Sequence, residues 1–178
     1  DQVVFTSGGT EANHLAVQGA GVQRHLISAV EHDSIRGAVI DAEIVPVDGN
    51  GIADLKVLER MLSVDPKPAL VSIMMVNNET GVIMPIADVS KIVHAHGSYL
   101  FSDAVQAAGK MTIDLGVLEQ ATNKTIPTTR ETNAHLKRLI ILLLPNLDHY
   151  LCLIYSSTEE PFRTKITLAL TETSPNTP

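Results

Sequence analysis

The apolar run at residues 69–76, ALVSIMMV, constrains the fold more than any other feature of the sequence. A run without polar alternation predicts a strand that is buried on both faces of a sheet. Shorter apolar or β-rich runs occupy residues 3–6, 25–29, 43–47 and 99–102. Segments with helical character lie between them, at residues 10–20, 33–40, 54–62 and 86–95. Strands that alternate with helices predict an α/β fold, with a mostly parallel sheet flanked by helices.

The composition changes sharply near residue 118. All eleven glycines lie at or before Gly116, whereas eleven of the fifteen threonines lie at or after Thr122. Residues 1–116 carry a net charge of −7, and residues 117–178 carry none. A break of this kind indicates a second domain, a linker or foreign sequence. We therefore expect an α/β part over residues 1–118 and a tail of different character over residues 119–178.

The charge and the cysteine content exclude several classes of protein. A formal net charge of −7 argues against binding to nucleic acid or to an anionic membrane. The single cysteine, Cys152, excludes an internal disulfide framework and a metal site with several cysteines. The chain opens without Met, which suggests a fragment, and without a secretory signal pattern, so a cytoplasmic location is expected.

The apolar run at residues 139–155 is long enough to suggest a membrane span. Pro145, Asp148 and His149 interrupt it, and a spanning helix is therefore not expected. A buried strand pair or a helix–turn–helix fits the pattern better.

Polar residues follow each predicted strand of the first part directly. They are Gly8, Gly9 and Thr10; Glu31 and His32; Asn77, Asn78, Glu79 and Thr80; and Asp103 and Gln106. In parallel sheets ligands bind at the carboxyl ends of the strands, so these groups are expected to converge on one edge.

The chemistry of these groups suggests a ligand but leaves alternatives open. Gly9 and Thr10 at a helix start suit an anion, although they also suit an ordinary helix cap. His32 suits stacking on a planar ligand, proton relay or metal binding, or is a hydrogen-bonded loop residue. Asp103 lies at the end of an apolar strand, where a carboxylate is costly unless it is paired. A cationic ring nitrogen, a metal or an arginine would each serve as its partner. Asn78 and Gln106 can orient a ligand or hydrogen-bond loop backbone.

Four segments in order resemble the cofactor-binding domain of the cysteine desulfurases and selenocysteine lyases. They are FTSGGTEANHLAV (5–17), SAVEHDSI (28–35), VSIMMVNNETGVIMPI (71–86) and SDAVQAAGKMTIDL (102–115). These enzymes are class V aminotransferase relatives, fold-type-I proteins that depend on pyridoxal 5'-phosphate (PLP). The resemblance implies that residues 1–118 are part of the large domain of such an enzyme.

The resemblance also implies a role for each matching residue. Gly9 and Thr10 would hold the cofactor phosphate, and His32 would stack on the pyridine ring as a catalytic residue. Asp103 would pair with the protonated ring nitrogen, and Gln106 would donate to the phenolic oxygen. A further residue, Asn78, would contact that oxygen or the amino-acid substrate.

The implied activity converts L-cysteine to alanine and leaves its sulfur as an enzyme-bound persulfide for iron–sulfur cluster assembly or other sulfur transfer. A homodimer and a sulfur-acceptor protein are implied as partners. In the family, the catalytic lysine is the last residue of a Ser-x-His-Lys pattern. At the family's spacing from Asp103, this chain has Thr129 in that position. Lys124 lacks that context, and Cys152 in LCLIY is better interpreted as a small buried residue. We therefore expect a truncated chain without turnover.

Three alternatives remain at this point. The chain could be a non-catalytic product that binds PLP or a partner subunit. It could act on selenocysteine, or it could be another class V enzyme such as an aminotransferase or a kynureninase-like enzyme.

Overall fold

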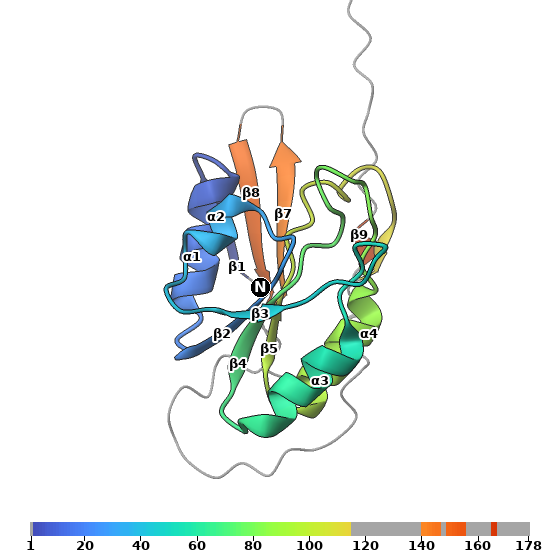
Figure 1. The fold of residues 1–178 in the computed structure, drawn as a ribbon. Helices are drawn as coiled ribbons and strands as arrows, with labels where there is room; N and C mark the ends of the chain where they lie inside the picture. The colour runs from blue at the N-terminus through green and yellow to red at the C-terminus, as the bar shows by residue number, and fades with distance from the viewer. Residues whose placement is uncertain (1, 115–139, 147–148, 156–164, 167–178) are drawn as a thin grey trace, which may run out of the picture.

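The computed structural model describes residues 2–114, 140–146, 149–155 and 165–166 (Figure 1). A four-stranded sheet with the order β3-β2-β4-β5 forms its centre. The strands are β2 (Arg24–Ser28), β3 (Glu43–Val45), β4 (Ala69–Ser72) and β5 (Tyr99–Phe101). Every pairing in this sheet is parallel, which confirms the predicted α/β class.

Helices cover both faces of this sheet. They are α1 (Gly9–Gly19), α2 (Asp33–Arg36), α3 (Leu55–Val64) and α4 (Ile86–Ala95). Figure 1 shows α1 and α2 on one side of the sheet and α3 and α4 on the other. Successive strand residues point to opposite faces, so Leu70 joins the core beneath α1 whereas Val71 joins the core beneath α3 and α4. Because β4 is buried on both faces, each of its positions favours an apolar or small residue, which explains the apolar run from which the fold was predicted.

The largest differences from the predicted element boundaries are two elements that end early. The strand expected over residues 69–76 ends at Ser72, although Met75 N still donates to Asp103 O at 2.8 Å. The helix expected over residues 33–40 ends at Arg36, because Gly37 and the β-branched pair Val39 and Ile40 are weak helix formers.

The first strand, β1 (Gln2–Thr6), lies outside the parallel sheet. It pairs antiparallel with β8 (His149–Tyr155), which pairs antiparallel with β7 (Ile140–Asn146). Of the two arrangements considered for residues 139–155, a strand pair or a helix–turn–helix, the structure has the strand pair. A short pair joins β6 (Ile113–Asp114) to β9 (Lys165–Ile166). Among the residues that the structure describes, no helix has the length and apolar character to cross a membrane.

Candidate functional site

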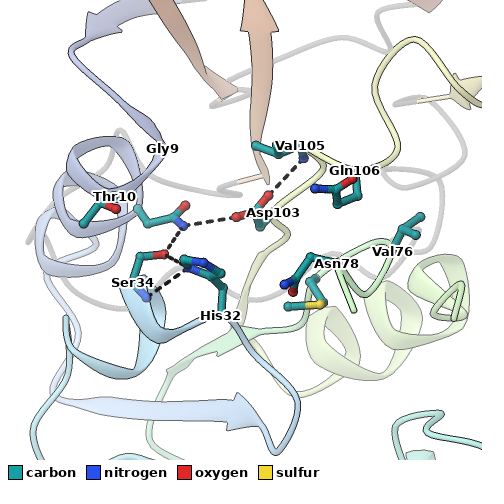
Figure 2. Close-up of a pocket in the computed structure, with 11 residues that line it drawn as sticks. Gly9, Thr10, His32, Ser34, Val76, Asn78, Asp103, Val105 and Gln106 are labelled. Atoms are coloured by element: carbon teal, nitrogen blue, oxygen red, sulfur yellow. Dashed lines mark hydrogen bonds between the residues drawn. The ribbon is translucent and has the colours of Figure 1, made fainter. Parts of the chain in front are cut away.

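One cavity of about 250 Å³ opens at the carboxyl edge of the parallel sheet (Figure 2). It is lined by Gly9, Thr10, Asn13, His32, Ser34, Met74, Val76, Asn78, Asp103, Val105 and Gln106. All six residues that the sequence singled out for cofactor binding therefore line the same cavity. They come from the segments after β1, β2, β4 and β5. For β2, β4 and β5, which belong to the parallel sheet, this is the arrangement that the rule for strand ends predicts.

Gly9 and Thr10 form the first turn of α1, on one wall of the cavity. The first N–H groups of a helix have no partner inside the helix and carry partial positive charge, which favours an anion. Neighbouring Ser7 donates its backbone N–H and its hydroxyl to Glu11 Oε2, at 2.7 and 2.6 Å. These bonds lower the pKa of the exposed Glu11 carboxyl. With Ser7 engaged in this way, Thr10 is the hydroxyl residue of this turn that lines the cavity.

His32 forms the N-cap of α2 on the neighbouring wall. Its Nδ1 accepts a hydrogen bond from the Ser34 backbone N–H at 3.1 Å and lies 2.8 Å from Ser34 Oγ. A backbone N–H can only donate, so Nδ1 is the acceptor and the neutral ring carries its proton on Nε2. The imidazole of His32 therefore takes the position of the capping acceptor of this helix.

Asp103 follows β5 and is only partly buried. Its Oδ1 accepts from Val105 N at 2.9 Å, and its Oδ2 accepts from Asn13 Nδ2 at 3.1 Å. Its backbone carbonyl is also fixed by Met75 N. Each carboxylate oxygen can accept more than one hydrogen bond, so this carboxylate is held in place and still able to accept a further donor.

Asn78 and Gln106 line the opposite side of the cavity from α1 (Figure 2). Gln106 Oε1 accepts from the exposed Lys110 Nζ at 2.8 Å. Because that contact occupies the amide oxygen, the amide nitrogen is the group that Gln106 offers as a donor. Asn77 shapes the adjacent turn, since its Oδ1 accepts from Glu79 N and Thr80 N at 3.0 and 2.8 Å.

A buried carboxyl group lies beneath the cavity. Glu31 is 6% exposed, and its Oε1 accepts from the backbone N–H of Met74, a cavity-lining residue. Its other oxygen has no hydrogen-bond partner among the described residues. Burial, with a smaller contribution from Asp103, raises the pKa of Glu31 to about 8. The carboxyl group is therefore protonated over much of the neutral range.

Two polar residues of the cavity, Asn13 and Ser34, were not singled out by the sequence analysis. Asn13 is 2% exposed and lies on the buried face of α1, between the core residues Ala12 and Ala16. Its amide nitrogen donates to Ser34 Oγ at 2.8 Å as well as to Asp103. A polar residue within the apolar stripe of a helix is the signal that could have identified Asn13, because a buried amide needs partners.

No group of three or more His, Cys, Asp or Glu side chains within the described residues has an arrangement that could hold a metal ion. The contacts of Asp103 in this region are with an amide and a backbone N–H. Its carboxylate thus lies against neutral donors.

Comparisons with known proteins identify relatives of residues 1–120, which match the profile of the family described as Aminotransferase class-V. The cysteine desulfurase IscS of Ehrlichia chaffeensis is 42% identical over 127 residues, covering 64% of this chain and 30% of that protein. The cysteine desulfurase of Homo sapiens is 40% identical over 129 residues, covering 64% of this chain and 27% of that protein. The chain thus spans less than a third of the length of these relatives.

Solved structures show the same likeness at the level of the fold. The NifS-like protein from Rickettsia africae ESF-5 superposes with a TM-score of 0.70 at 27% identity, covering 90% of this chain and 42% of that protein. A structure described as mouse CSAD superposes with a TM-score of 0.62 at 16% identity, covering 86% of this chain and 37% of that protein, and therefore supports the fold alone.

Proposed function

Because this chain belongs to the aminotransferase class-V family, whose expected cofactor is PLP, we propose that the cavity is the cofactor site of a cysteine desulfurase-like carbon–sulfur lyase. The observation that carries the proposal is the convergence of Thr10, His32 and Asp103 on one cavity from three separate strand ends. Thr10 suits a phosphate, His32 suits the face of a flat ring, and Asp103 suits a cationic nitrogen. A flat, phosphorylated and cationic ligand uses all three.

The chemistry of the lining groups fits PLP. Thr10 and the first turn of α1 suit the phosphate, since a hydroxyl donor lies beside the positive end of a helix. Asp103 suits a protonated ring nitrogen, because its carboxylate is already oriented by Asn13 and Val105. His32 presents an imidazole on a third wall, where it can stack on the ring.

When bound, PLP withdraws an electron pair from the α-carbon of an amino-acid substrate. In the proposed site Asp103 holds the proton on the ring nitrogen and so keeps the ring cationic. Gln106 donates its amide N–H to the phenolic oxygen, which matches the use of its amide oxygen by Lys110. Asn78 binds the substrate or that same oxygen. These roles extend the resemblance residue by residue.

The proposed reaction of the complete enzyme is the transfer of sulfur from L-cysteine to a cysteine thiol, which leaves alanine and an enzyme persulfide. The persulfide sulfur would pass to an acceptor protein, and iron–sulfur cluster assembly is the proposed use. A homodimer is part of this proposal. Selenocysteine is the second candidate substrate, and a screen of cysteine, selenocysteine and kynurenine as substrates of the complete enzyme separates the candidates.

We further propose that this chain alone has no turnover. Cys152 lies in β8, where it pairs with Val4 of β1 and Leu143 of β7, and a strand between two others does not carry a mobile thiol. Lys124 and Thr129 lie outside the described residues. The division at residue 118 and the cytoplasmic location stay predictions, as does the non-catalytic alternative of a product that binds PLP or a partner subunit.

PLP titration followed by absorbance tests the cofactor site. We expect saturable binding that Thr10→Val and Asp103→Ala each weaken by roughly tenfold or more, as loss of a hydrogen bond to a charged group implies. Thr112→Val and Asp88→Asn are matched controls at exposed positions outside the cavity. Equal affinity of the wild-type chain and the two cavity variants would contradict the proposal.

Turnover needs a separate measurement. Incubation with PLP and L-cysteine should yield no more alanine than the Thr10→Val/Asp103→Ala double variant does. Borohydride treatment followed by mass spectrometry should find no lysine that carries the cofactor. Alanine above the double-variant level would refute the absence of turnover while leaving the cofactor site in place.

A further inference from the structure

Asn13 joins two walls of the cavity that are far apart in sequence. Its amide nitrogen donates to Ser34 Oγ at 2.8 Å and to Asp103 Oδ2 at 3.1 Å. The three residues come from α1, α2 and the segment after β5. Each of the two hydrogens on this nitrogen therefore serves a different wall.

The orientation of the Asn13 amide follows from its partners. A carboxylate only accepts hydrogen bonds, so the group of Asn13 that faces Asp103 must be the NH₂. The amide oxygen is buried and has no partner among the described residues. Leaving a buried acceptor unpaired is costly, which indicates that the two donated hydrogen bonds determine how this side chain lies.

Ser34 extends the connection to His32. Its hydroxyl oxygen accepts from Asn13, and the same oxygen lies 2.8 Å from His32 Nδ1. Nδ1 is an acceptor, because it also receives the Ser34 backbone N–H. The hydroxyl proton of Ser34 therefore points at His32, and the order of contacts is Asp103, Asn13, Ser34, His32.

We propose that Asn13 and Ser34 are positioning residues that connect Asp103 to His32 through one hydrogen-bonded chain and so fix the two groups relative to each other. This inference rests on the proposed function, in which Asp103 meets the ring nitrogen and His32 meets the ring face. Asn13 holds one carboxylate oxygen of Asp103 in place. Through Ser34 it also fixes the imidazole as the Nε2–H tautomer with its plane set before the cofactor arrives. Groups held in this way need little reorganisation on binding.

Nitrogen-15 NMR of the histidine rings, without PLP, tests the connection directly. We expect Asp103→Asn to shift the Nδ1 resonance of His32, although the two side chains are separated by Asn13 and Ser34. The same substitution made in an Asn13→Ala chain should produce a clearly smaller shift, since the chain of hydrogen bonds is then interrupted. An equal shift in both backgrounds would overturn the inference, because it would show a direct effect of the Asp103 charge.

PLP affinity provides an independent readout. Ser34→Ala should weaken binding about three- to tenfold, and Asn13→Ala should weaken it more. The double variant should bind no more than about twofold more weakly than Asn13→Ala, because both residues belong to one chain of hydrogen bonds that either substitution interrupts. Ser34→Thr, which keeps the hydroxyl, should restore most of the affinity. If the fold-losses in PLP affinity of the two single variants multiply in the double variant, the inference is overturned.

Ser90 provides a matched control elsewhere in the fold. It is a buried serine in α4 whose Oγ lies 3.1 Å from His94 Nδ1. Ser90→Ala should change the His94 resonance and leave His32 and PLP affinity unchanged. If the wild-type chain binds no PLP, the proposed function fails, whereas the NMR experiment still decides whether Asn13 and Ser34 form the connection. Circular dichroism of every variant verifies that the fold is retained.

Discussion

Glu31 connects the stability of the fold to pH, because its carboxyl group is buried beneath the cavity. Burial raises its pKa from 4.5 to about 8 in the folded chain. Between these values the folded state holds a proton that the unfolded state has released, so stability falls as pH rises. Each pH unit in this window costs up to about 1.4 kcal/mol. Urea unfolding at pH 6 and pH 8 should therefore show a clear loss of stability at the higher pH.

Glu31→Gln isolates this effect. The amide keeps an acceptor for Met74 N and cannot ionise, so the variant should lose most of the pH dependence and exceed the wild-type stability at pH 8. Glu59→Gln, at an exposed position in α3, should behave like the wild-type chain. A wild-type chain equally stable at pH 6 and pH 8 would show that Glu31 is ionised without cost.

At the same scale, the sequence singled out six residues of the cavity but not the polar residues Asn13 and Ser34. His32 and Asp103 follow strands of the parallel sheet, whose carboxyl ends share one edge. Thr10 follows β1, which lies outside that sheet, so the strand-end rule does not account for its place in the cavity. Asn13 and Ser34 depend on how α1 and α2 pack against each other. That packing is a tertiary property and cannot be inferred from strand ends.

Among the helices, α3 has the clearest local determinant of its start. Asp54 is its N-cap, and Asp54 Oδ1 accepts from Lys56 N and Val57 N at 3.0 and 3.1 Å. Asp54→Ala should lower the free energy of unfolding by about 1 kcal/mol, because two N–H groups lose their acceptor. Asp54→Ser should recover most of that loss, and Asp88→Ala provides a control near the start of α4. Chemical denaturation measures all three, and an unchanged Asp54→Ala chain would refute the role of the cap.

Element boundaries could be predicted where local signals are strong. The range expected for α4, residues 86–95, is the range observed, since its apolar spacing is regular and Pro85 precedes it. The end of β4 could not be predicted, because the apolar run continues past Ser72. Beyond Ser72, the backbone of Met75 forms hydrogen bonds with Asp103 on one side and with Met84 on the other. Apolar character alone does not distinguish a strand from the buried loop that follows it.

At the scale of the whole molecule, the parallel sheet could be predicted from the alternation of strands and helices, but the place of β1 could not. Its partner is β8, separated from it by more of the chain than any local pattern spans. The strand pair within residues 139–155 was among the expectations, whereas its pairing with β1 was not. Long-range pairing depends on which edges remain open once the rest of the sheet has formed.

A proline in β8 tests whether this pairing holds β1. Leu153 lies opposite Val3 of β1 and Leu142 of β7, and proline there removes the backbone N–H and strains the strand. Hydrogen exchange of the Leu153→Pro chain should show faster exchange across residues 2–6 than in the wild-type chain. Amides of β2 and β4 should keep their protection, since they belong to the other sheet. Unchanged exchange in β1 would show that β8 does not support it.

Two residues separate the end of β1 from Gly9 and Thr10, so the turn that we propose as the phosphate site follows a strand whose partner is found more than a hundred positions later in the chain. Under the proposed function, a genetic screen for lost vitamin B6 retention would consequently recover substitutions at residues 149–155 as well as in the cavity. Substitutions at residues 149–155 would then be mistaken for the loss of direct cofactor contacts, unless the pairing between β1 and β8 were considered.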